Sequence, residues 1–172
     1  MKKYIIITLT LVLILGTTAT AKAESGAFWF SGGCLDGNGS LSMGFGGKNL
    51  GVEFGMIDDS TLPDGTLDYE CPHWDYTSLG SQRLGSTVGF DLIGMIHLSD
   101  NILFYGGPGI YWYETGEVVR SNATGWLYTQ TVDTYTELAC SGGVKFRLTE
   151  GTRLGIGYHS LRGTNLIFQL CF

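Results

Sequence analysis

Long hydrophobic runs are scarce in this sequence of 172 residues. The longest, Ile5 to Leu15, contains Thr8 and Thr10 and is shorter than the roughly 20 residues that a membrane-spanning helix needs. No later segment has about 18 or more consecutive uncharged apolar residues, so we do not expect a membrane-spanning helix. Proline is also scarce, with three residues, and proline is poorly tolerated inside β-strands.

The four cysteines, at positions 34, 71, 140 and 171, include no CxxC pair. This spacing excludes a zinc ribbon and a thioredoxin-type redox motif. The histidines are too scattered to indicate a metal site, and we expect neither a metal nor a cofactor. An exported chain would meet an oxidising compartment, which leaves a disulfide open.

Positive charge is low once the N-terminus is set aside. Lys2 and Lys3 precede the apolar run, and Ala21-Lys22-Ala23 follows it, as in a secretory signal peptide. We therefore predict a signal peptide at 1–23, cleaved after Ala23, and one domain at 24–172. The mature charge would be 7 − 16 = −9. This balance argues against nucleic acid as a partner.

The remaining composition favours β structure, with 27 Gly, 9 Tyr, 9 Phe and 4 Trp. Period-2 segments separated by turn residues predict eight strands. Their ranges are 27–34, 40–46, 50–57, 83–98, 102–116, 132–148, 152–161 and 164–172. Five connections are short, whereas 58–82 and 117–131 are long, as in bacterial barrels with short periplasmic turns and longer outer loops. Arg162-Gly163 is interpreted as one of the short turns.

Strand parity indicates which surface meets lipid. In the fourth segment Val88, Phe90 and Leu92 share one face, whereas Thr87 and Asp91 share the other. Mid-strand charges on one parity, an export signal and a terminal aromatic favour a membrane barrel over a soluble one. The predicted fold is an all-β, eight-stranded antiparallel transmembrane barrel behind a cleavable signal peptide. Its lumen would be packed by a polar network of Glu53, Arg83, Asp91, Glu137, Lys145, Arg147, Arg153 and His159.

Some of the aromatic residues clustered near the strand ends are expected to form the interfacial girdles of such a barrel. The clusters are Phe28, Trp29 and Phe30; Phe104 and Tyr105; and Tyr111, Trp112 and Tyr113.

The closing segment 155–172 resembles the last hairpin of small OmpA/OmpX/OmpW-type and opacity-type barrels, and so does the early strand 49–56 with Glu53. The resemblance implies an outer-membrane protein of a Gram-negative bacterium, in contact with lipid and lipopolysaccharide, and we expect a monomer. It also implies a C-terminal signal read by the barrel-assembly machinery. That signal would be Leu166, Phe168, Leu170 and Phe172.

One pair suggests chemistry. His159-Ser160 resembles the His and Ser of lipid A deacylases, with Glu137 or Glu114 as an acidic third member. That family separates the two residues by one position, whereas here they are adjacent and face opposite sides of a strand. The leading expectation is therefore no catalytic residue and no enzyme.

The two long connections are the predicted carriers of function. Segment 58–82 is acidic, and 117–131 contains apolar Trp126, Leu127 and Tyr128, which either mark a contact surface or extend the neighbouring hairpin. A Cys34–Cys71 bridge is a further hypothesis. The leading function is a structural, adhesive or envelope-integrity role through surface loops. The alternatives are a narrow transport barrel for small molecules and a lipid A-modifying enzyme.

Overall fold

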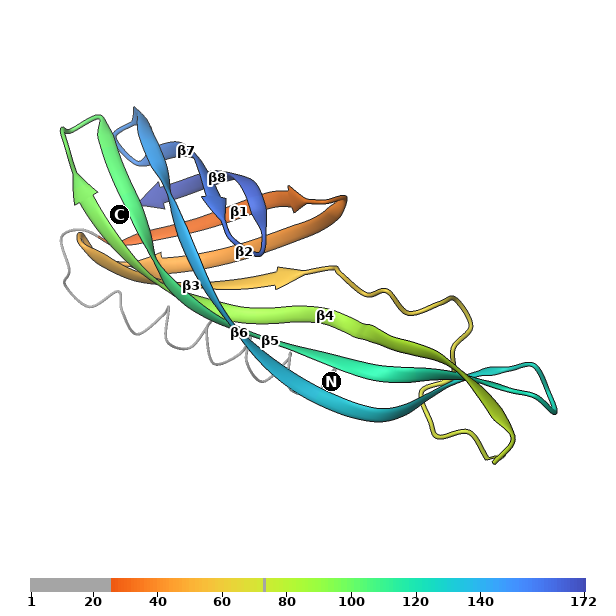
Figure 1. The fold of residues 1–172 in the computed structure, drawn as a ribbon. Coiled ribbons are helices and arrows are strands. Elements are labelled where there is room, and N and C mark those ends of the chain that lie inside the picture. The colour runs from red at the N-terminus through yellow and green to blue at the C-terminus, as the bar shows by residue number, and fades with distance from the viewer. Residues whose placement is uncertain (1–25, 73) are drawn as a thin grey trace.

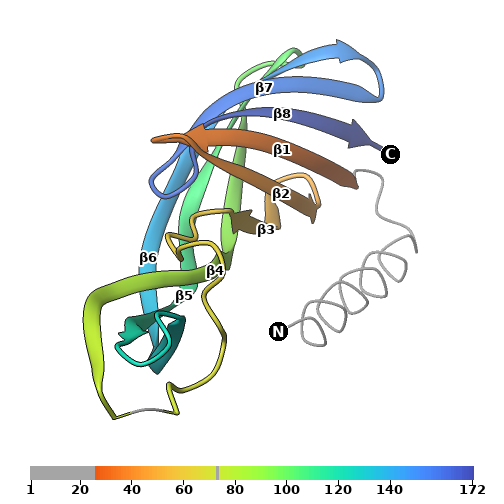
Figure 2. The same ribbon diagram turned by 90° about the vertical axis from the view of Figure 1, so that its right-hand side faces the viewer.

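The computed structural model describes residues 26–72 and 74–172. The expected signal peptide, 1–23, lies outside the described residues. Eight antiparallel strands follow one another around a closed barrel, and β8 returns to pair with β1 (Figures 1 and 2). The strands are β1 (Ala27–Leu35), β2 (Asn38–Gly46), β3 (Leu50–Ile57), β4 (Tyr76–His97), β5 (Ile102–Ser121), β6 (Leu127–Thr149), β7 (Thr152–His159) and β8 (Gly163–Cys171). The predicted fold class and strand number are confirmed.

Three strands are longer than the sequence indicated. β4, β5 and β6 project well beyond the other five strands (Figure 1). Residues 76–82 therefore belong to β4, so that loop was predicted too long. Most of 117–131 belongs to the β5–β6 hairpin, which confirms the alternative interpretation that this segment extends the hairpin. Register shifts at Ser78/Gly80 and Gly116/Glu117 and a left-handed φ of 44° at Thr131 interrupt the alternation. Such β-bulges break the period-2 pattern that identifies a strand.

The two ends of the barrel differ. Residues 47–49, 98–101 and 150–151 form tight connections at one end, where the main chains of Gly26 and Phe172 also bond to each other at 2.8 and 2.9 Å. The other end carries the long strands and the described residues of segment 58–75 (58–72 and 74–75), which arch beside them (Figure 2). We call these the periplasmic end and the outer end, because outer-membrane barrels keep their short turns on the periplasmic side.

The barrel surface has the polarity of a membrane protein. Leu92, Ile96 and Leu138 point outward and are 51%, 72% and 81% exposed. Charged Asp91 and Lys145 point inward and are at most 1% exposed. A closed sheet leaves no unpaired edge in lipid, and an apolar exterior around a polar interior is the arrangement of an outer-membrane β-barrel. Within the described residues, no helix is long and apolar enough to cross a membrane.

Candidate functional site

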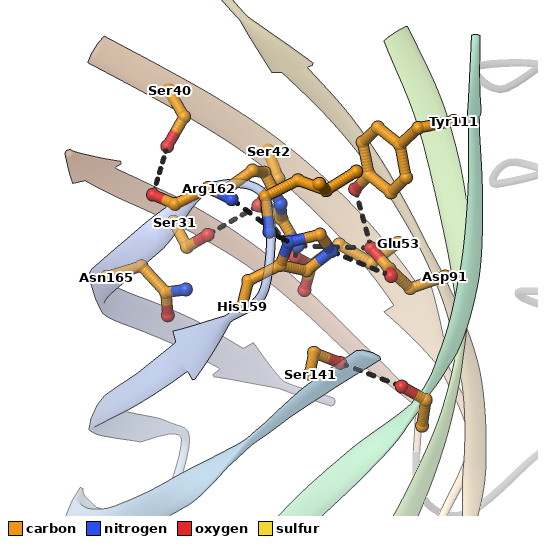
Figure 3. A network of polar contacts seen from close by, with 12 residues as sticks. Ser31, Ser40, Ser42, Glu53, Asp91, Tyr111, Ser141, His159, Arg162 and Asn165 are labelled. Carbon is orange, nitrogen blue, oxygen red and sulfur yellow. Dashed lines mark hydrogen bonds and ion pairs between the residues drawn. The ribbon is translucent and has the colours of Figure 1, made fainter. Parts of the chain in front are cut away.

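A buried ion-pair network fills the middle of the barrel (Figure 3). Arg162, from the turn between β7 and β8, reaches inward and is 2% exposed. Its Nη2 atom donates to Glu53 Oε1 of β3 and, at 3.1 Å, to Asp91 Oδ2 of β4. One guanidinium therefore neutralises two carboxylates from neighbouring strands, whose register places Glu53 directly opposite Asp91.

Glu53 has further partners from the first two strands. Trp29 Nε1 donates to Oε2 at 2.5 Å, and Ser42 Oγ donates to Oε1 at 2.8 Å. Ser31 in turn bonds to Ser42. Both carboxylate oxygens are thus satisfied, as a buried charge requires.

Asp91 joins His159 and Tyr111 to the network. His159 Nε2 lies 3.0 Å from Asp91 Oδ1, and the Tyr111 hydroxyl donates to Asp91 Oδ2 at 2.8 Å. His159 Nδ1 accepts the N–H groups of Leu161 and Arg162, both at 3.1 Å. Because Nδ1 is an acceptor, Nε2 carries the proton and donates it to Asp91. His159 thereby fixes the turn that delivers Arg162.

Lys145 of β6 lies below this network, toward the periplasmic end. Its Nζ donates to Gln169 Oε1 at 2.8 Å and lies 4.3 Å from the Trp29 ring and 5.0 Å from the Tyr105 ring. Two aromatic faces and one amide thus take the place of a carboxylate partner. The lumen at this height is packed by side chains, as an eight-stranded barrel requires.

The structure brings Glu53, Asp91 and His159 together and places Lys145 beside them. The four other residues of the predicted network lie at the two ends, because equal parity puts residues on one face without giving them equal height. Arg83 pairs with Asp59 at the outer end, Glu137 lines a cavity there, and Arg147 and Arg153 lie at the periplasmic end.

Three central members were missing from the sequence-based network. Arg162 was assigned to a two-residue turn, yet the turn spans 160–162 and its arginine points inward. Trp29 and Tyr111 were named in the aromatic clusters from which some residues would form the girdles, and both are instead 0% exposed in the lumen. The available signal was parity, since Trp29 shares a face with Ser31 and not with Phe30.

The candidate catalytic residues are not assembled into a triad. His159 faces the lumen with both ring nitrogens engaged. Ser160 Oγ accepts the N–H of Cys140 at 3.1 Å, and Glu137 contacts neither of them through a hydrogen bond within the described residues. Among the described residues, neither His159 nor Glu137 is hydrogen-bonded to Ser160 as an activating base would be.

At the outer end, segment 58–75 is fastened to the projecting strands. Leu67 exchanges main-chain bonds with Leu127 at 2.9 Å and Thr129 at 3.0 Å. Asp59 is 6% exposed, pairs with Arg83, and accepts the N–H and hydroxyl of Thr87 at 3.1 and 2.8 Å. The segment and the three strands thus form one body, which we call the outer projection (residues 58–86 and 113–137).

The outer projection leaves one strand edge open. β6 pairs with β7 only from Ser141, whereas its pairing with β5 continues to Leu127. Between Thr129 and Cys140, the described residues offer β6 no backbone partner on the β7 side. The Cys140 carbonyl accepts the N–H of Ser160 on that side. Along an antiparallel strand, the N–H and C=O groups of successive residues point alternately to the two neighbouring strands. The free groups therefore belong to Val132, Thr134, Thr136 and Leu138.

The four cysteines are free thiols, so the hypothesised Cys34–Cys71 bridge is not formed. Cys34 lies at the end of β1 in the barrel wall, opposite Gly39 and Thr164. Cys71 belongs to the segment held against the far part of β6, which explains their separation.

Each end of the barrel holds a cavity. The periplasmic one has a volume of about 270 Å³ and the outer one about 220 Å³. Trp29, Lys145 and the Arg162 network lie between them. The two cavities are therefore separate vestibules on either side of a packed plug.

No protein-family model and no curated protein matches this chain. Among solved structures it is similar to Ail, the attachment invasion locus protein of Yersinia pestis, with 12% identity over 86% of this chain and 92% of that chain at a TM-score of 0.40. The complex of Ail with the heparin analogue sucrose octasulfate matches at a TM-score of 0.36, again with 12% identity over 86% and 92% of the two chains. Neisserial surface protein A matches at 0.41, with 13% identity over 86% of this chain and 90% of that chain. At these values the likeness is one of general architecture alone.

Proposed function

We propose that this outer-membrane barrel is a surface attachment protein that binds an extended segment of an external protein along the open edge of β6. The observation that carries this proposal is the uncovered edge from Val132 to Leu138 on the outer projection. An unpaired strand edge is a template for another strand, and main-chain hydrogen bonds supply the affinity of such β-augmentation.

The geometry of the projection supports this function. β6 from Leu127 to Cys140 runs beyond the last residue pair with β7, which amounts to about 45 Å of strand at about 3.3 Å per residue. Residues 131–136 are all exposed, and most are β-branched or aromatic. Such residues favour strand pairing, so the edge is ordered before a partner arrives.

The charge of the projection indicates the chemistry of the partner. Segments 58–86 and 113–137 together contain ten carboxylates and two arginines, counted as six and four acids, with Arg83 and Arg120. Asp133 and Glu137 lie within the open edge itself. Basic residues in the incoming strand would be attracted to this surface, and acidic ones repelled.

The barrel supplies a support for the projection in this proposal. The packed lumen supports this role rather than transport, and the separate contacts of His159 and Ser160 support it rather than catalysis. The outward apolar residues of β8, among them Leu166 and Phe168 at 69% and 42% exposure, would contact lipid and lipopolysaccharide. Together with Leu170 and Phe172 they are also the proposed signal for the assembly machinery. The proposed form is a monomer.

The test removes one edge donor. Thr136→Pro deletes an N–H that faces the open side and places a ring in the path of an incoming strand, a change that edge strands tolerate. The probe is a synthetic peptide of alternating Lys and Val, titrated against the protein in detergent micelles. We expect Thr136→Pro to weaken peptide binding by about tenfold or more, since one main-chain hydrogen bond is lost, at about 1 kcal/mol, and the ring clashes with the incoming strand.

Thr136→Val is the matched control, because it keeps the N–H and a β-branched side chain. A peptide with Glu in place of Lys tests the charge requirement. Hydrogen exchange at Val132, Thr134, Thr136 and Leu138 should slow when the basic peptide binds. Equal peptide binding by the proline and valine variants would overturn the proposal, as would concentration-dependent dimers that occupy the edge without any peptide.

A further inference from the structure

The periplasmic end of the barrel carries a basic cavity unrelated to the outer projection. Its wall includes Lys48 from the β2–β3 turn, His97 from the end of β4 and Arg153 from β7. Gln169 lies in the same wall, and its Oε1 atom accepts a hydrogen bond from Lys145 Nζ. Three separate elements thus direct basic side chains into one space of about 270 Å³.

Arg153 is incompletely satisfied. Its Nη2 donates to the main-chain oxygen of Asp100 at 3.4 Å, a long contact. Its Nη1 is buried and has no hydrogen-bond partner within the described residues. A buried donor of a charged group costs free energy when it has no acceptor. A bound ligand that accepts a hydrogen bond from Nη1 would remove this cost.

A second arginine lies next to it. Arg147 of β6 is directly opposite Arg153 in the antiparallel register, so both side chains are on the same face. Like charges in such a pair repel each other. Arg147 Nε donates only to the Thr149 main-chain oxygen, at 3.2 Å, and neither arginine forms an ion pair among the described residues.

Acidic groups at this end do not neutralise the arginines. Glu150 also lines the cavity, but it makes no ion pair with them in the part of the chain that the structure describes. One main-chain oxygen of Phe172, which also lines the cavity, accepts the N–H of Gly26 at 2.8 Å in the barrel closure. The basic groups of this mouth, Lys48, His97, Arg147 and Arg153, outnumber its acidic groups, Glu150 and the carboxylate of Phe172.

We propose that the periplasmic mouth is a binding site for a phosphate-class oxyanion, held by Arg153 and Arg147 with Lys48 and His97 around it. Tetrahedral oxyanions accept several hydrogen bonds at once and match the planar fork of arginine. Such a ligand satisfies the orphan Nη1 donor and relieves the repulsion between the two arginines. It enters from the periplasm, because the plug closes the other side of the cavity.

The experiment titrates inorganic phosphate into the refolded protein in a phosphate-free sugar detergent, followed by calorimetry. We expect saturable binding that Arg153→Gln weakens by about tenfold, the loss of one charge-assisted hydrogen bond. Arg147→Gln, at an exposed position, provides a second variant that retains the fold and should weaken binding similarly. Arg120→Gln removes an exposed arginine from the outer projection and should leave phosphate binding unchanged.

A second arm identifies the source of the phosphate. The same micelles are doped with phosphatidylglycerol, without free phosphate, and retained lipid is measured by native mass spectrometry. Phosphate binding without lipid retention assigns the site to a free oxyanion, and arginine-dependent lipid retention assigns it to a headgroup. If neither ligand binds, or if both glutamine variants bind as well as Arg120→Gln, the proposal is wrong.

Discussion

Replacing Arg162 by methionine should destabilise the barrel by about 3–5 kcal/mol, the cost of leaving buried charges without their partner. Arg162 is the cation that Glu53 and Asp91 share, and both carboxylates are nearly inaccessible at 4% and 0% exposure. Methionine keeps much of the side-chain length, so the loss reports the charge and its hydrogen bonds. Urea unfolding in micelles, followed by the gel shift between folded and boiled protein, measures it.

Two comparisons make this result specific. Arg120→Met removes an exposed arginine and should cost about 0.5 kcal/mol or less. Adding Glu53→Gln and Asp91→Asn to Arg162→Met should recover part of the lost stability, because the uncompensated charges disappear. If Arg162→Met were no less stable than Arg120→Met, the ion-pair network would not be holding the lumen together.

The barrel could be predicted from the sequence because its surface pattern is local. Along the membrane part of β4, Val88, Phe90 and Leu92 alternate with Thr87 and Asp91, and a two-residue period needs no knowledge of the neighbouring strand. The projection was harder to predict. At Gly80 and Thr131 the backbone enters the left-handed region, with φ of 96° and 44°, and the alternation changes phase. A bulge and a loop look alike in sequence, so these strands were predicted too short.

The lumen contacts needed three-dimensional information. Glu53 and Asp91 could be placed inside by parity, but their shared partner depends on strand tilt and register, which set the height of each residue. Arg162 follows β7 in a short turn, and only the folding of that turn around the His159 ring directs its guanidinium inward. Arg153, by contrast, has the parity of a lumen residue but lines the periplasmic cavity and does not join the network.

The second large effect concerns Trp29, which closes the lumen between the periplasmic cavity and the Arg162 network. Its ring is 0% exposed and donates to Glu53 at 2.5 Å. The ring lies so close to Gly44 and Gly51 that a Cβ atom at either position would collide with it. Its register partner, Gln169, lines the cavity. Trp29 is thus the largest single part of the plug.

Trp29→Ala should therefore destabilise the protein by about 3–5 kcal/mol, the usual cost of truncating a buried tryptophan. It should also create a conductance in planar bilayers, where we expect none for the wild type, because water can then enter beside the polar groups of Glu53 and Lys145. Trp112→Ala is the control, since Trp112 packs against Phe90 on the outer face at 5.8 Å between ring centroids. It removes the same side chain without opening the lumen. Conductance in the wild type would instead favour transport, and a silent Trp29→Ala variant would show that the remaining ion pairs close the barrel without it.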